Sequence, residues 1–342
     1  MRKPSLILLA LLTCLIPASS FAQIDIAPGR YEKAIVVIGE NLGYDDLFTT
    51  DHANDEWGDY ATYINDPNTG LLSVAVNYSN AHSNLHPSLP NYLALFSGSN
   101  QGIGADGCVC GTGNPDPCGD TITCNGNSYS AVTAPTIYSR LKNDLDGDTR
   151  FVLYVEGLND NNTNNFVCSN ADYYQKHNPA AFFTASRSDE ACNQLGTVWT
   201  GFGQNSSPPA PETLPKGVTF IVPGQDHNGH NGTNTQAKTI AWNTWLLNNM
   251  PTYVDYALQR NNYKNNTDTV LLIITQDEKS AGYYGDPNHI LLLLIAADLT
   301  PTTDCANLPM AHYNTLKTIT KDFGVSDLNS GYSALIPLIA CP

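Results

Sequence analysis

Residues 269–278, TVLLIITQDE, give the clearest indication of the fold. From Thr269 to Thr275 it contains only apolar and β-branched residues, which predicts a strand buried on both faces. A second run of this kind, AIVVI at residues 34–38, also leads into a polar segment. Strands that are covered on both faces are typical of a parallel sheet packed between helices.

Strands and helices are expected to alternate along the rest of the chain. We expect Pro251 to break the longest helix and Gly324 to end the last one. The alternation predicts an α/β fold, a three-layer sandwich with a mostly parallel central sheet and helices on both faces. Further apolar runs that fit strands lie at 71–76, 151–155, 218–222 and 290–296, and helical spacing predicts helices at 90–96, 136–145, 239–258 and 313–323.

The start of the chain has the features of a secretory signal peptide over residues 1–22. Two basic residues precede an apolar run at 6–15, and residues 20–22 form a small-x-small cleavage site. We expect the mature chain, residues 23–342, to form a single domain that is secreted or periplasmic. It contains no apolar run of the ~20 residues that span a bilayer, so stable membrane insertion is not expected.

Charge narrows the range of partners. The chain has 16 basic and 32 acidic residues, a net charge of −16, and removal of Arg2 and Lys3 with the signal peptide makes it −18. Such a surface repels nucleic acid and anionic membranes. If the substrate is itself an anion, a bound divalent cation would reverse the local sign.

Nine cysteines are present, and Cys14 lies within the signal peptide, where a lipoprotein site is the weaker alternative to plain cleavage. An even number of cysteines in an exported chain predicts disulfides that stabilise the loops, whose pairing the sequence leaves open. A zinc site is the weaker alternative, because the spacings do not form two CxxC pairs. The eight are Cys108, Cys110, Cys118, Cys124, Cys168, Cys192, Cys305 and Cys341.

Oxygen-bearing side chains follow the two strongest strands. Glu40 and Asn41 come after the first strand, and Asp277 and Glu278 come after the strand at 269–275. Ligands of open α/β sheets bind at the carboxyl ends of the strands, and hard divalent cations prefer oxygen ligands. These four residues are therefore candidate metal ligands, and the alternative is that they are ordinary polar residues at strand exits.

Ser88 precedes a predicted helix within HPSLPNY, residues 86–92. One interpretation is that Ser88 only caps this helix. The other uses the same position for chemistry: a helix N-terminus favours phosphate, and a metal beside Ser88 would help its hydroxyl attack phosphorus. A further cluster, QDHNGH at residues 225–230, contains His227 and His230, which are metal ligands, proton donors or exposed polar residues.

Together these segments resemble the phosphoesterase family that includes bacterial acid phosphatases and phospholipases C of the alkaline-phosphatase-like superfamily. The number and order of the matching segments make the resemblance specific, and HPSLPNYLAL at 86–95 is the most diagnostic. The others are 35–41 with Tyr44, Asp45 and Phe48; Ser97 and Gly98; 136–138 with Leu141; 154–157; 177–179; Pro223 with His227, Gly229 and His230; 272–278; and 312–313.

The resemblance implies roles for individual residues. Ser88 would be a nucleophile that forms a phosphoserine intermediate, assisted by His227 and His230. The metal, which could be Ca, Mg, Mn or Zn, would be held by Glu40, Asn41, Asp277 and Glu278. Only one metal is expected, because Asn228 and Asn231 stand where aspartate is common in the family. The residues implied to bind substrate are Asn91, His86, His177, His289 and His312.

The expected function is therefore that of a secreted, metal-dependent phosphoester hydrolase, an acid phosphatase acting on a small phosphomonoester. The nearest alternative is a phosphodiesterase of phospholipase C type. An alternative of another class is a disulfide-rich, Ca²⁺-binding surface protein without catalysis.

Overall fold

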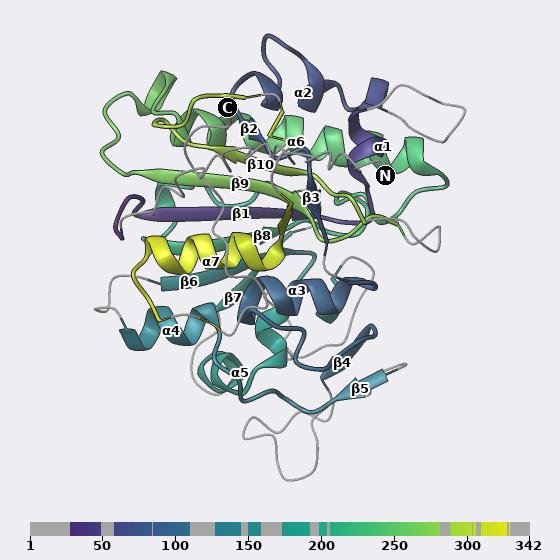
Figure 1. The fold of residues 1–342 in the computed structure, drawn as a ribbon, viewed down its shortest axis with the longest axis vertical. Coiled ribbons are helices and arrows are strands. Elements are labelled where there is room, and N and C mark those ends of the chain that lie inside the picture. Colours follow the sequence, from purple (N-terminus) through teal and green to yellow (C-terminus); the bar gives the residue numbers. More distant parts are fainter. Residues whose placement is uncertain are drawn as a thin grey trace, which may run out of the picture.

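The computed structural model describes residues 28–48, 58–83, 85–109, 127–144, 150–158, 173–191, 198–203, 206–280, 288–302, 304–305, 309–326 and 328. At its centre is a seven-stranded sheet in the order β2-β10-β9-β1-β8-β6-β7 (Figure 1). The strands are β1 (Lys33–Gly39), β2 (Val76–Asn77), β6 (Arg150–Glu156), β7 (Trp199–Phe202), β8 (Gly217–Val222), β9 (Val270–Gln276) and β10 (Leu292–Ile295).

The sheet is mostly parallel, as predicted. Strands β9, β1, β8, β6 and β7 run in the same direction, and β10 is antiparallel to both β9 and β2. Two small sheets lie outside it: β3 (Ala81–His82) pairs with β11 (Met310–Ala311), and β4 (Gly107–Val109) pairs with β5 (Asn127–Tyr129).

Helices cover both faces of the sheet, which confirms the three-layer prediction. Alternate residues of β1 enter two separate cores: Ala34, Val36 and Ile38 pack on one side and Ile35 and Val37 on the other. The first core includes residues of α3 (Ser88–Ser97), α4 (Ile137–Asp144) and α7 (His312–Asp322). The second includes residues of α1 (Tyr44–Phe48), α2 (Thr62–Asn65) and α6 (Thr235–Ala257).

Short elements complete the described chain. Helix α5 (Thr184–Ala191) contacts α4, and the 3₁₀ helices lie at Gly58–Tyr60, Leu71–Ser73, Gln175–His177, Pro179–Phe182, Pro211–Thr213 and Asn261–Tyr263. Cys108 and Cys305 are each disulfide-bonded, and the other cysteines lie outside the described residues, as does the predicted signal peptide. Within the described part of the chain, no helix combines the length and hydropathy needed to cross a membrane.

Three details of the sequence-based assignment were wrong. Helix α6 continues through Pro251 instead of breaking there. A proline removes the hydrogen bond to the carbonyl four residues earlier, and that residue, Leu247, is 48% exposed, so water can take the place of the lost donor. The run at 71–76 starts as a 3₁₀ helix, and only Val76 belongs to a strand. The edge strand β7 was not predicted.

Candidate active site

The two predicted pairs of oxygen-bearing residues meet at one edge of the sheet. Strands β1 and β9 are parallel neighbours with Gly39 opposite Gln276, so both chains leave the sheet at the same level. The Asp277 N–H donates to the Gly39 carbonyl at 2.9 Å, and the Asn41 N–H donates to Asp277 Oδ1 at 3.3 Å. The side chains of Glu40, Asp277 and Glu278 are all buried there.

Ser88 turns its hydroxyl toward these carboxylates. It is the first residue of α3, and the N-cap position belongs to Pro87, so the interpretation of Ser88 as a helix cap is wrong. The Ser88 Oγ atom lies 3.1 Å from Glu40 Oε2 and 3.1 Å from Glu278 Oε1. Because a hydroxyl has a single hydrogen, it donates to one of these oxygens at a time. Ser88 is only 1% exposed.

Asn91 shapes the segment that precedes Ser88. Its Oδ1 accepts the Leu85 N–H at 3.0 Å, and its Nδ2 donates to the carbonyls of Leu85 (2.7 Å) and Pro87 (3.3 Å). The side chain is fully buried, and both of its polar atoms bond to backbone. This geometry suits a residue that positions Ser88 better than the substrate contact expected from the sequence.

A lysine and an aspartate that the sequence analysis missed lie beside Ser88. The Lys176 Nζ atom is 3.5 Å from Ser88 Oγ and 2.7 Å from Asp106 Oδ2, and Asp106 Oδ1 accepts the Leu89 N–H at 3.1 Å. Burial lowers the pKa of Lys176, but the negative charges of Glu40 and Asp106 raise it above its usual value, so the ammonium stays charged. The only signal for Lys176 in the sequence was its position directly before His177, which begins one of the segments that resemble the family.

Two of the predicted histidines lie near Glu40. His177 Nε2 is 3.0 Å from Glu40 Oε1, and the ring of His177 is 5.1 Å from that of Tyr92 and 6.2 Å from that of His230. Burial lowers the pKa of His230, against the opposing effect of the Glu40 charge.

The loop that carries His230 packs tightly against the end of β1. Its Asn228 carbonyl accepts the Glu40 N–H at 2.8 Å, and Gly229 has a φ of +98°. A Cβ atom on Gly229 would stand 2.7 Å from the Glu40 carbonyl oxygen, so this close approach requires glycine. The loop therefore fixes both His230 and the backbone of Glu40.

The other predicted histidines have different surroundings. His86 Nδ1 makes a short contact with Glu278 Oε2, and the His86 side chain is 36% exposed. His312 is buried and donates from Nε2 to the Asp277 carbonyl at 2.7 Å, and burial lowers its pKa to about 4. His289 stacks on Tyr44 at 4.4 Å and bonds to the Ser79 carbonyl.

His227 faces another part of the molecule. Its Nδ1 lies 2.8 Å from Glu156 Oε1, and its side chain lines a cavity between β6 and α6. The structure thus brings Glu40, Asp277 and Glu278 together with Ser88. The predicted histidines beside this group are His86, His177 and His230, whereas His312 contacts only the backbone there, and His289 and His227 pair elsewhere.

The carboxylates at the strand ends have the donor chemistry of a cation site. Burial and the nearby charges of Glu40 and Glu278 raise the pKa of Asp277 well above its usual range. Burial and the Glu40 charge raise the pKa of Glu278 to about 8. Burial also acts to raise the pKa of Glu40, but the adjacent His177 and Lys176 lower it to about 2. Packing three carboxyl groups together in this way is unfavourable unless positive charge is added.

Of these buried oxygens, Asp277 Oδ2 has no hydrogen-bond partner among the described residues, whereas Glu40 Oε1 is paired with His177 Nε2 at 3.0 Å. Together with Glu278 they offer the oxygen ligands that a hard divalent cation takes. The donor types therefore fit a metal, although no three His, Cys, Asp or Glu side chains of the described chain already form a ready-made ligand set.

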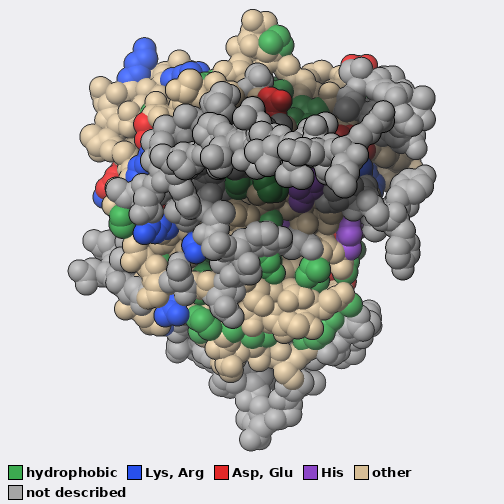
Figure 2. Space-filling model, in the orientation of Figure 1, with side chains coloured by type: hydrophobic (Ala, Val, Ile, Leu, Met, Phe, Trp, Pro, Cys, Tyr) green, Lys and Arg blue, Asp and Glu red, His purple; other side chains and the backbone are tan. Residues whose placement is uncertain are grey.

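Taken with the fold, this cluster defines an α/β enzyme whose polar site lies at the carboxyl ends of parallel strands. Histidine side chains visible in Figure 2 lie on the side of the molecule where the arrows of β1 and β9 end in Figure 1. The chain belongs to the phosphoesterase family, whose family model matches residues 72–326. It is therefore a hydrolase that acts on phosphoester bonds, as the sequence resemblance predicted.

The chain is also similar to individual known proteins. The chain is 27% identical over 272 residues to a phosphatidylinositol-3-phosphatase of Mycobacterium tuberculosis, which covers 79% of this chain and 73% of the relative. A protein of the alkaline phosphatase superfamily from Vibrio parahaemolyticus superposes with a TM-score of 0.49 at 11% identity, over 89% of this chain and 69% of that one. The C-terminal periplasmic domain of EcEptC from Escherichia coli, in complex with Zn, superposes with a TM-score of 0.48 at 9% identity, over 90% of this chain and 86% of that one.

Proposed function

We propose that the protein is a secreted, metal-dependent phosphomonoesterase of acid phosphatase type, with Ser88 as its nucleophile. The observation that carries this proposal is the position of Ser88 Oγ, 3.1 Å from an oxygen of each of two buried carboxylates and 3.5 Å from the Lys176 ammonium. A hydroxyl oriented by hydrogen bonds to buried carboxyl groups and next to a cation is suited to attack an anionic phosphoryl group.

In the first step the Ser88 Oγ atom forms a bond to phosphorus, and the bond from phosphorus to the leaving oxygen breaks. The hydroxyl proton is released to water, and His230 gives a proton to the leaving alkoxide. Water then hydrolyses the phosphoserine and releases phosphate. The phosphoryl group reaches Ser88 from the side of His86 and Lys176, whose side chains are 36% and 15% exposed.

Glu40, Asn41, Asp277 and Glu278 are the residues that would hold the cation, which is Ca, Mg, Mn or Zn. When bound, it would supply positive charge that favours the serine alkoxide and the phosphoryl oxygens. The buried Asp277 Oδ2, which has no hydrogen-bond partner among the described residues, supports this part of the proposal.

A phosphomonoester is preferred as the substrate over a phosphodiester. The relative from M. tuberculosis is named as a phosphatase. Residues 1–22 support export, and the strongly negative net charge makes a small substrate more suitable than an anionic membrane surface. The phospholipase C alternative uses the same site, so only rates separate the two. A surface protein without catalysis agrees poorly with membership of a hydrolase family.

The test is replacement of the nucleophile. Ser88→Ala should abolish trapping of ³²P on the protein and nearly all turnover of a phosphomonoester. Ser97→Ala is the matched control, because Ser97 is buried in the same helix and bonds only within the Leu93–Gln101 segment. Retained turnover in Ser88→Ala would refute the proposal, and higher rates on a diester or on phosphatidylcholine would favour the alternative.

A further inference from the structure

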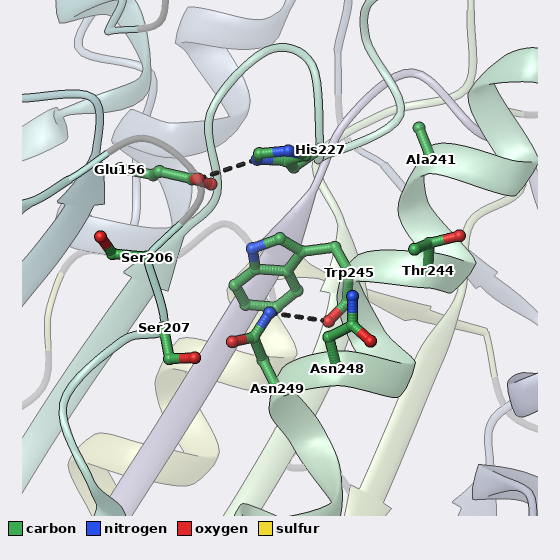
Figure 3. A pocket seen from close by; sticks show the side chains of 9 residues that line it. All are labelled: Glu156, Ser206, Ser207, His227, Ala241, Thr244, Trp245, Asn248 and Asn249. Atoms are coloured by element: carbon green, nitrogen blue, oxygen red, sulfur yellow. Dashed lines mark hydrogen bonds and ion pairs between the residues drawn. The ribbon is translucent and has the colours of Figure 1, made fainter.

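A polar cavity lies on the β6 side of the sheet, and none of the residues that surround Ser88 line it. It has a volume of about 380 Å³ and is bounded by the end of β6, the loop after β8, the start of the segment after β7 and one face of α6. Figure 3 shows Glu156 and His227 on one side of it and Asn248 and Asn249 on the other, with the Trp245 indole between them.

The indole of Trp245 is the group in the lining that indicates a ligand. Trp245 is 4% exposed, and its Nε1 is buried without a hydrogen-bond partner among the described residues. A buried N–H that bonds to nothing is unfavourable, so the cavity favours an occupant that presents an acceptor oxygen to it. The indole also offers an apolar ring face, against which the C–H groups of an occupant can pack.

The remaining lining is polar and almost uncharged. Glu156 is 1% exposed, and its two oxygens are held by His227 Nδ1 and by the Gly224 N–H, each at 2.8 Å. No lysine or arginine lines the cavity within the described chain, so an anion such as phosphate would find no counter-charge. An organic cation could approach the carboxylate and the ring, but a quaternary ammonium group has no acceptor for the indole N–H.

The mouth of the cavity supplies both donors and acceptors. Asn248 and Ser206 are exposed there, and Asn249 donates through Nδ2 to the Trp245 carbonyl at 2.9 Å. Amide and hydroxyl groups that each donate and accept are matched by adjacent hydroxyls on a ring. We propose that this cavity binds a neutral polyhydroxylated ring, a hexose or a cyclitol, with one hydroxyl oxygen accepting the Trp245 N–H. The proposal does not depend on the function of Ser88.

The test is isothermal titration calorimetry of the whole mature protein with glucose and, in a separate titration, with myo-inositol. We expect saturable binding of at least one of them. Trp245→Phe keeps an aromatic ring but removes the N–H, and should weaken binding about fivefold to tenfold. Trp242→Phe is the control, because Trp242 lies one turn earlier in α6, is stacked at 5.8 Å on Trp245 and does not line the cavity.

A second pair of variants keeps the test valid if Trp245→Phe fails to fold. Asn248→Ala should weaken binding, whereas Leu247→Ala, an exposed neighbour that does not line the cavity, should not. Absence of saturable binding, equal affinities in Trp245→Phe and Trp242→Phe, or tighter binding of choline than of either polyol would overturn the proposal. The first result would mean that water alone fills the cavity.

Discussion

The ammonium group of Lys176 lies 2.7 Å from the carboxylate of Asp106, a residue 70 positions earlier in the chain. Asp106 also accepts the Leu89 N–H at the start of α3, so the ion pair fixes Lys176 against the helix that begins with Ser88. In a chain with a net charge of −16, this pair places a cation 3.5 Å from the proposed nucleophile.

Loss of the Lys176 charge should impair catalysis strongly. We expect Lys176→Met to lower kcat/KM for a phosphomonoester about 100-fold, because a preorganised cation beside the phosphoryl group is lost. Lys176→Arg, which keeps the charge, should retain a larger part of the wild-type kcat/KM than Lys176→Met does. Lys216→Met is the control, since Lys216 forms an exposed pair with Glu32 near the opposite ends of the strands. Wild-type kinetics in Lys176→Met would show that this lysine has no part in the reaction.

Removal of a proposed ligand should reduce metal retention. We expect Asp277→Asn to lower the affinity for the divalent cation by about tenfold or more, because a charged oxygen ligand is lost. Metal content after dialysis, measured by mass spectrometry, gives a readout besides activity. Asp298→Asn serves as the control, because Asp298 pairs with Arg30 away from the site. Full activity after chelation with verified metal loss would contradict metal dependence.

Asn91 should matter for stability and for the position of Ser88. Asn91→Ala removes three hydrogen bonds to the backbone of Leu85 and Pro87 from a fully buried position. We expect a loss of about 2–3 kcal/mol in the free energy of unfolding, and a fall in kcat larger than any change in KM. Urea denaturation and steady-state kinetics measure the two effects. Asn262→Ala, at an exposed position, should change neither.

Asp322 should make stability depend on pH. Burial raises its pKa from 3.8 to about 6, although it accepts the N–H groups of Arg30 and Tyr31. Between these two values the folded state binds more protons than the unfolded state, so stability falls as pH rises from about 4 to about 6. The loss amounts to at most about 3 kcal/mol.

This dependence is measured as the difference between wild type and Asp322→Asn in urea denaturation across that range of pH. Because asparagine cannot ionise, the stability of Asp322→Asn relative to that of the wild type should increase as pH rises. A difference that stays constant with pH would show that the Asp322 carboxyl has the same pKa in the folded and unfolded states.

The strands were the most predictable part of the fold. The runs at 34–38 and 269–275 correspond to β1 and β9 to within one or two residues at their ends, because uninterrupted apolar and β-branched sequences of this length are stable only when both faces are buried. The edge strand β7, with the sequence WTGF, lacks such a run, and its place was fixed by pairing with β6. The effect of Pro251 was predicted wrongly because the expectation that proline breaks a helix does not consider whether water can replace the backbone N–H that proline lacks.

The sequence alone was sufficient to predict the buried central strands, their mostly parallel direction and the chemical type of the residues at their carboxyl ends, because these are properties of short segments. Which of the eight histidines approach the site depends on how distant segments pack, and this became visible in the folded chain alone. His227 and His230 belong to one short loop, yet His227 pairs with Glu156 while His230 lies near His177. Side-chain direction in such a loop depends on backbone angles that distant contacts impose, and Lys176 reached Ser88 for the same reason.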